Sequence, residues 1–284
     1  MYTTLIETAE LAERLDDPDC AILDCRFELG RPDWGEQEYA RGHIPNALYA
    51  HLERDLSGPV TASTGRHPLP SMDDFARAAS RWGIGPGVQV VAYDQGSGAF
   101  AARLWWLLRW AGHTQVAVLN GGFAAWQQAG LPVSREPVAR EPRDFVPRPS
   151  PVRPITTDEL ERALAAGEVQ PVDARSADRF AGENETIDPV AGHIPGARNH
   201  PFTRNLDERG RFLPPQALRE RWLQTLGGQP PERIVAMCGS GVTACHNLLA
   251  MEIAGLPGAR LYGGSWSEWI RDPARPVERG ATLP

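Results

Sequence analysis

The chain has 284 residues, of which 42% are hydrophobic and 23% are charged, so it is long and apolar enough for two domains that each bury a core. All 29 of its lysine-plus-arginine residues are arginines, which excludes a nucleotide site of the GxxxxGK[ST] kind and Schiff-base chemistry. The net charge of −7, with acidic and basic residues interspersed, argues against nucleic acid as a partner.

The chain shows no signal for export or membrane insertion. Its first 15 residues lack a basic start followed by an apolar run, and the apolar stretch at 104–110 is too short to span a bilayer. We therefore expect a cytoplasmic protein with no membrane partner. The cysteines are too few for a disulfide scaffold and match no zinc spacing, which predicts free thiols, no metal and no cofactor. They are Cys20, Cys25, Cys238 and Cys245.

Short β-rich runs alternate with helical stretches along the chain. In chain order, strands are predicted at residues 21–24, 88–93, 116–119, 169–173, 234–237 and 259–262. Helices are predicted at 99–110 and 242–253. This alternation is typical of an α/β fold in which helices cover both faces of a parallel sheet.

The same segments occur twice in the same order. GHIPNA at 42–47 returns as GHIPGA at 192–197, and LDCR at 23–26 returns as VDAR at 172–175. VVAYD and NGGFAAW in the first half likewise correspond to IVAMC and GGSWSEW in the second. These matches indicate a duplication, so each half should be one α/β unit.

A proline-rich stretch separates the two copies. Prolines recur among arginines and glutamates from residue 132 to 154, a composition that favours extended backbone and cannot sustain a helix. We predict an N-terminal domain at 1–133, a linker at 134–154 and a C-terminal domain at 155–284.

The second copy places a thiol where parallel sheets bind their ligands, beyond the carboxyl end of a strand. Cys238 ends the strand predicted at 234–237, and a small-residue loop then opens a helix. Glycines there let backbone N–H groups converge, and the helix N-terminus adds partial positive charge, a setting that stabilises a thiolate. The first copy has Asp94 at this position, so we expect it to be non-catalytic.

These motifs together resemble the tandem rhodanese family of sulfurtransferases, over residues 5 to 279. The loop CGSGVTA is similar to that of the mercaptopyruvate branch, whereas the thiosulfate branch usually carries a basic residue in its loop. The resemblance implies transfer of a sulfane sulfur from 3-mercaptopyruvate or thiosulfate to a thiol or cyanide, through a persulfide on Cys238. A reduced thioredoxin-like protein is a candidate thiol acceptor. The loop residues expected to bind the substrate are Gly239, Gly241, Val242 and Thr243.

The resemblance also implies that Arg179 binds the anionic end of the donor, since a guanidinium pairs naturally with two carboxylate oxygens. Mercaptopyruvate enzymes usually have a second arginine shortly before the GHIPG motif. Residues 183–189 of this chain contain none. Either another arginine, such as Arg66 or Arg103, reaches the site, or the donor is held differently.

A Ser-His-Asp relay has been proposed for the mercaptopyruvate branch, and by motif position it would consist here of Ser240, His67 and Asp55. Such a relay would assist proton handling at the donor. The spacing between Asp55 and His67 is one residue longer than the family pattern. The alternative is that Ser240 only orders its loop and His67 only caps a turn. His43 and His193 recur in both copies, so we expect a shared structural role for them.

Three other functions compete with this interpretation. A phosphatase of the Cys-x5-Arg type would need an arginine in residues 239–244, and the loop has none. A thiosulfate-specific sulfurtransferase would share the fold but prefer another donor. A non-catalytic persulfide carrier or partner-binding module would show no turnover with a small donor and cyanide.

Overall fold

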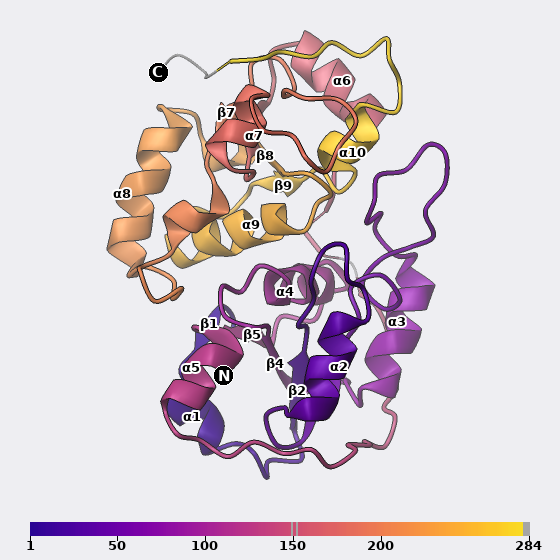
Figure 1. Ribbon diagram of the computed structural model, residues 1–284, viewed down its shortest axis with the longest axis vertical. Coiled ribbons are helices and arrows are strands. Elements are labelled where there is room, and N and C mark those ends of the chain that lie inside the picture. The colour runs from indigo at the N-terminus through magenta and orange to yellow at the C-terminus, as the bar shows by residue number, and fades with distance from the viewer. Residues whose placement is uncertain (149, 152, 281–284) are drawn as a thin grey trace. The chain divides into compact units, whose positions relative to one another are not determined.

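The computed structural model describes residues 1–148, 150–151 and 153–280 (Figure 1). Pro149 and Val152 of the predicted linker, and the last four residues of the predicted C-terminal domain, lie outside the described residues. The chain forms two compact units. The first comprises Met1–Gly58, Pro70–Pro151 and Glu208–Phe212, and the second comprises Pro59–Leu69, Val152–Asp207 and Leu213–Pro284. The segment Pro59–Leu69 therefore belongs to the second unit although it precedes the linker.

Within the described residues, the first unit has a five-stranded sheet in the order β1-β5-β4-β2-β3, and every neighbouring pair is parallel. Its strands are short and rich in buried valine, isoleucine and alanine, as expected for a sheet covered on both faces. They are β1 (Leu5–Ile6), β2 (Cys20–Asp24), β3 (Ala47–Tyr49), β4 (Gln89–Tyr93) and β5 (Val116–Leu119).

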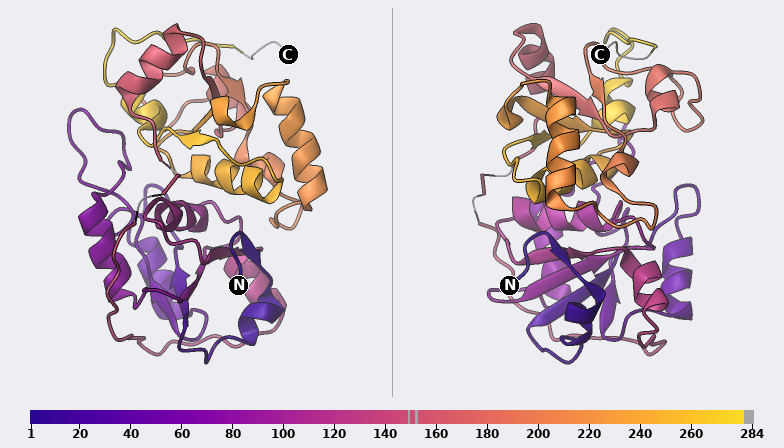
Figure 2. Two further views of the ribbon diagram at one scale, coloured as in Figure 1. Left: turned by 180° about the vertical axis from the view of Figure 1, so that it is seen from behind. Right: turned by 90° about the vertical axis from the view of Figure 1, so that its left-hand side faces the viewer.

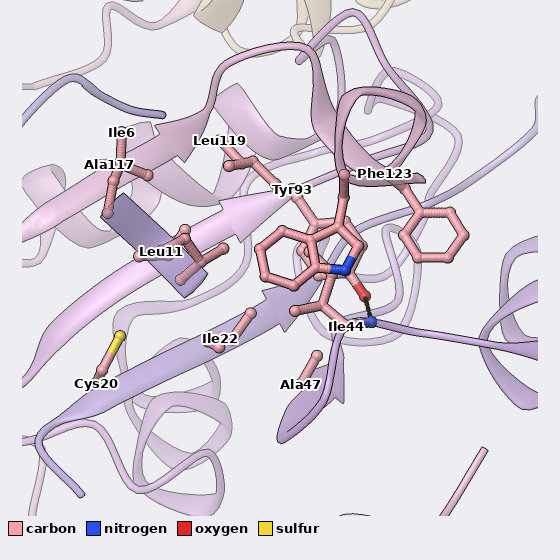
Figure 3. Packing of buried hydrophobic residues seen from close by; sticks show 12 residues of the cluster. Ile6, Leu11, Cys20, Ile22, Ile44, Ala47, Tyr93, Ala117, Leu119 and Phe123 are labelled. Atoms are coloured by element: carbon pink, nitrogen blue, oxygen red, sulfur yellow. Dashed lines mark hydrogen bonds between the residues drawn. The ribbon is translucent and has the colours of Figure 1, made fainter. Parts of the chain in front are cut away.

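Helices lie on both sides of this sheet (Figures 1 and 2). They are α1 (Thr8–Ala12), α2 (Trp34–Arg41), α3 (Met72–Arg81), α4 (Ala101–Trp110) and α5 (Gly122–Gln128). On one face, Leu11 of α1 and Trp126 of α5 pack with strand residues such as Ile22 and Leu119 (Figure 3). The apolar helix α4 packs along β4 and β5. Successive strand side chains alternate between the faces, so both receive a core.

The second unit repeats this plan with a parallel sheet in the order β7-β6-β8-β9 among the described residues. Helix α9 lies along β8, and Trp266 and Trp269 of α10 join the core with Val235 and Met237 of β8. The strands are β6 (Gln170–Asp173), β7 (Arg198–Asn199), β8 (Ile234–Met237) and β9 (Arg260–Leu261). The helices are α6 (Thr157–Ala165), α7 (Ala177–Ala181), α8 (Pro215–Leu226), α9 (Thr243–Ile253) and α10 (Ser265–Trp269), with short 3-10 turns η1 (Phe202–Asn205) and η2 (Pro231–Arg233).

The two units preserve the same local contacts at the GHIP motif. His43 Nδ1 lies 2.9 Å from the carbonyl oxygen of Tyr39, and its ring stacks on that tyrosine. His193 Nδ1 lies 2.7 Å from the carbonyl oxygen of Phe180 and stacks on that ring in the same way. These equal contacts in both copies agree with the expected structural role of this histidine pair.

The predicted fold class, two parallel α/β units, is confirmed. Each predicted strand lies within a residue or two of an observed one. The sequence prediction missed β1, β3 and β7, because strands of two or three residues show no periodicity. No helix in the described part of the chain is long and apolar enough to cross a membrane.

Candidate active site

Cys238 lies at the carboxyl end of β8 and is only 2% exposed. The backbone N–H of Gly241 donates to its Sγ over 3.1 Å. Its own N–H donates to Ser265 Oγ over 3.0 Å, and its carbonyl oxygen accepts the N–H of Trp266. The sulfur therefore sits beside a backbone donor in the loop that opens α9, where a thiolate or a persulfide anion gains a hydrogen bond and the helix N-terminal field.

The shape of this loop depends on glycine at two positions. Gly241 has φ +79°, and a Cβ there would lie 2.3 Å from the carbonyl oxygen of Gly263. A Cβ on Gly239 would lie 2.9 Å from Nη2 of Arg66 and 3.7 Å from Nη2 of Arg179. Gly241 thus permits the turn that aims its N–H at the sulfur. Because Gly239 has no side chain, the guanidinium groups of Arg66 and Arg179 have room next to it, one residue after Cys238.

Ser240 and His67 meet in the second unit. Ser240 Oγ lies 2.8 Å from His67 Nδ1, and both side chains are buried. The segment that carries His67 is held against α10 and the residues that follow it: the N–H of Arg66 donates to Ser267 Oγ over 3.0 Å, and Arg271 Nε donates to the carbonyl oxygen of Thr64. The structure therefore brings together two of the three residues predicted for the relay.

Asp55 lies in the first unit, where its carboxylate accepts hydrogen bonds from the N–H of His51 and from Arg81 Nη2, at 2.9 and 3.0 Å. Arg103, one of the two arginines considered for the donor, is fully buried in the same unit, with Nε and Nη2 donating to the carbonyl oxygen of Leu56. The other one, Arg66, is the arginine found beside Gly239.

Two carboxylates hold the arginines beside the cysteine loop. Glu185 accepts hydrogen bonds from Nε and Nη2 of Arg179, at 2.9 to 3.2 Å, and Arg175 is 3.3 Å away. Asp188 accepts from Arg179 Nη2 at 3.2 Å through Oδ2 and from Arg66 Nη1 through Oδ1. Sequence reasoning missed both carboxylates. The available signal was three acidic residues in 183–189, Glu183, Glu185 and Asp188, in the stretch where an arginine was sought.

The electrostatic environments of these two carboxyls differ. Burial opposes ionisation of Glu185, but the N–H of Asp188 and the guanidinium of Arg179 outweigh it and lower the pKa of that carboxyl. Burial raises the pKa of the Asp188 carboxyl above its ordinary value, although the charge of Arg66 acts in the opposite direction. The surroundings of Glu185 therefore favour its ionised form, whereas burial disfavours the ionised form of Asp188.

The first unit shows what the equivalent loop does without a thiol. Asp94 ends β4, and its carboxylate accepts backbone N–H groups from Gly96, Gly98, Phe100 and Ala101 at 2.8 to 3.3 Å. The loop in this fold is thus an anion-binding loop, and in the first unit its own side chain fills it.

The remaining cysteines lie in settings that favour the thiol. Burial raises the pKa of Cys20 to about 11, and it raises the pKa of Cys25 well above its ordinary range. Cys245 Sγ donates to the carbonyl oxygen of Gly241 over 3.3 Å. None of the four cysteines is in a disulfide bond, as the sequence predicted.

The protein has two α/β units, each with a parallel sheet, and the second carries a cysteine at a strand end inside an anion-binding loop. These features define a class of tandem-domain proteins whose site stabilises an anionic cysteine sulfur. Comparison with family models identifies the family. The model for the rhodanese-like domain matches residues 7–129 and 156–272, so the chain belongs to the rhodanese-like family, in which it is a sulfurtransferase.

Several relatives match nearly the whole chain. A probable 3-mercaptopyruvate sulfurtransferase of Pseudomonas aeruginosa is 51% identical over 97% of this chain and 98% of its own length. A putative thiosulfate sulfurtransferase of Mycobacterium tuberculosis is 40% identical, with 97% of each chain covered. The solved structure of 3-mercaptopyruvate sulfurtransferase from Leishmania major superposes with a TM-score of 0.84 at 34% identity, over 94% of this chain and 74% of that one.

Proposed function

We propose that this protein transfers the sulfur atom of 3-mercaptopyruvate to a thiol acceptor or to cyanide, through a persulfide on Cys238, in which that atom is the outer, sulfane sulfur. The observation that carries the proposal is the N–H of Gly241 aimed at Sγ, with two arginines beside Gly239. The neutral loop, the named relatives and the carboxylate-binding chemistry of arginine favour mercaptopyruvate as the donor.

The reaction divides into two covalent steps. In the first, the Cys238 thiolate attacks the sulfur of the donor, and the C–S bond breaks with its electron pair moving to carbon. The resulting pyruvate enolate takes a proton, and the proton lost by the donor thiol balances it. In the second step, cyanide or a thiolate attacks the outer sulfur of the persulfide and leaves the Cys238 thiolate behind. The N–H of Gly241 stabilises the sulfur anion.

We propose that the Ser240–His67 pair moves the proton of the first step. His67 Nδ1 and Ser240 Oγ are in hydrogen-bond contact, and Ser240 is two residues from Cys238. Asp55 remains a predicted third member of this relay. Thiosulfate transfer needs no such proton, because the S–S bond breaks to give sulfite directly.

Replacing His67 is therefore expected to separate the two donors. We expect His67→Gln and Ser240→Ala to lower kcat with mercaptopyruvate by about tenfold to a hundredfold, at the lower end of general acid–base effects. Turnover of thiosulfate by the same variants should stay within about twofold, since no proton is transferred there. Equal losses with both donors would instead indicate that the pair only orders the loop.

Arg179 tests how the donor is bound. Arg179→Ala removes a charged contact to the donor carboxylate, and we expect kcat/KM for mercaptopyruvate to fall by at least about tenfold. The measurement is kcat/KM for mercaptopyruvate and for thiosulfate on one preparation of wild type and variant. If thiosulfate is the better donor, the protein belongs with the thiosulfate enzymes, a second candidate favoured by the relative from Mycobacterium tuberculosis.

The proposed acceptor is a thiol, and a reduced thioredoxin-like protein is a suitable source. Four cysteines without a disulfide are consistent with a reducing compartment such as the cytoplasm. Steady-state turnover with a small donor and cyanide distinguishes this enzyme from a persulfide carrier, which would load Cys238 once and then stop.

A further inference from the structure

The carboxylate of Asp188 bridges the two arginines of the site. One oxygen accepts from Arg66 and the other from Arg179, and both guanidinium groups lie against Gly239, next to Cys238. A single carboxylate thus already occupies the space between two arginines beside the reacting sulfur. The spacing of Arg66 and Arg179 suits one monoanionic carboxylate with an oxygen on each guanidinium.

The two arginines differ in how firmly they are held. Arg179 has a second partner in Glu185, which the N–H groups of Ile187 and Asp188 fix in turn. Arg66 is fixed through its backbone on Ser267, and its buried Nε–H has no acceptor among the described residues. If Asp188 withdrew, Arg179 would stay in place, and Arg66 would offer Nη1 and Nε to an incoming anion.

We propose that Asp188 occupies the seat of the donor carboxylate in the free enzyme, and that the donor displaces it and binds between Arg66 and Arg179. This inference rests on the proposed function, because it takes the donor to be the carboxylate-bearing 3-mercaptopyruvate. Arg66, from a segment far from the second repeat in sequence, then supplies the second donor-binding arginine that residues 183–189 lack. Asp188 is an internal competitor that raises KM.

The charges around the seat give the direction of each effect. Arg66 and Arg179 face Glu185 and Asp188, so these four groups sum to zero when all are ionised. Asp188→Asn leaves one uncompensated positive charge for the donor. Arg66→Ala removes one of the two charged contacts and leaves a net negative charge, which opposes the donor.

The test is steady-state kinetics with mercaptopyruvate and cyanide, which in a two-step scheme give a separate kcat/KM for each substrate. We expect Asp188→Asn to lower KM for mercaptopyruvate by about threefold or more, and Arg66→Ala to raise it by about tenfold or more, the size of one charged contact. Arg66→Lys should retain part of the affinity. The kcat/KM for cyanide should not change, since the persulfide no longer holds the donor carboxylate.

Two controls remove a charge without touching the seat. Glu183→Gln takes one negative charge from the exposed part of the same loop, and Arg162→Ala takes one positive charge from the exposed face of α6. The inference is overturned if Asp188→Asn behaves like Glu183→Gln, or if Arg66→Ala behaves like Arg162→Ala. It is also overturned if Arg66→Ala lowers kcat/KM for cyanide as much as for the donor, as a misfolded loop would.

Pyruvate, the carboxylate product, gives a readout that needs no turnover. We expect pyruvate to raise the melting temperature of Asp188→Asn more than that of wild type, and to leave the melting temperature of Arg66→Ala unchanged. Equal shifts of the melting temperature in all three proteins would contradict the proposal that Asp188 occupies the position of the donor carboxylate. A wild-type protein that forms no persulfide with mercaptopyruvate would contradict the proposed donor instead, so the two failures can be told apart.

Discussion

Cys238→Ser is expected to abolish sulfur transfer, with no turnover above background for either donor. A serine hydroxyl is a weak nucleophile at neutral pH and cannot carry a sulfane sulfur, so the first covalent step has no acceptor atom. The loop should persist, since Gly241 N–H can donate to an oxygen in place of Sγ. Turnover and mass spectrometry of donor-treated protein check the result: wild type should gain about 32 Da, one sulfur atom, on Cys238.

The other cysteines are the matched controls for this experiment. Alanine at Cys20, Cys25 or Cys245 should leave most of the activity, because these thiols are buried and the raised pKa values of Cys20 and Cys25 keep them protonated at neutral pH. Added sulfur found on one of these residues, with Cys238 unmodified, would refute the assignment of the nucleophile.

Gly241→Ala should cause the second-largest loss, about a hundredfold or more in kcat/KM, comparable to removal of an oxyanion-hole donor. The backbone at Gly241 is left-handed, and its new methyl group would meet the carbonyl oxygen of Gly263 at 2.3 Å. Since that neighbour is backbone, the loop must shift and its N–H must move away from the sulfur. We expect a lower melting temperature together with loss of donor turnover.

Gly228→Ala separates this effect from backbone strain alone. Gly228 lies in the same unit with φ +81°, close to the +79° of Gly241, and a Cβ there would meet nothing within 4 Å. The control variant should lose about 1 to 2 kcal/mol of stability, the cost of the left-handed conformation for alanine, and keep its activity. If both variants kept full turnover, the N–H of Gly241 would have no part in the chemistry.

Local sequence determined much of this protein. The alternation of apolar runs and helices predicted the parallel sheets, and the repeated GHIP segments predicted two copies of one unit. Cys238 could be placed at a strand end because β8 and the glycine loop are contiguous in sequence. These features depend on near neighbours along the chain, where periodicity and turn-forming residues determine the backbone.

Tertiary structure alone decided the partners around the sulfur. His67 and Ser240 are 173 residues apart, and Arg66 and Asp188 are 122 apart, yet each pair is in contact because the segment Pro59–Leu69 packs within the second unit. A sequence pattern shows which arginines could bind an anion, but it does not show that Arg66 and Arg179 donate to the same carboxylate, that of Asp188. That depends on long-range packing, which positions side chains whose separation along the chain carries no information about distance.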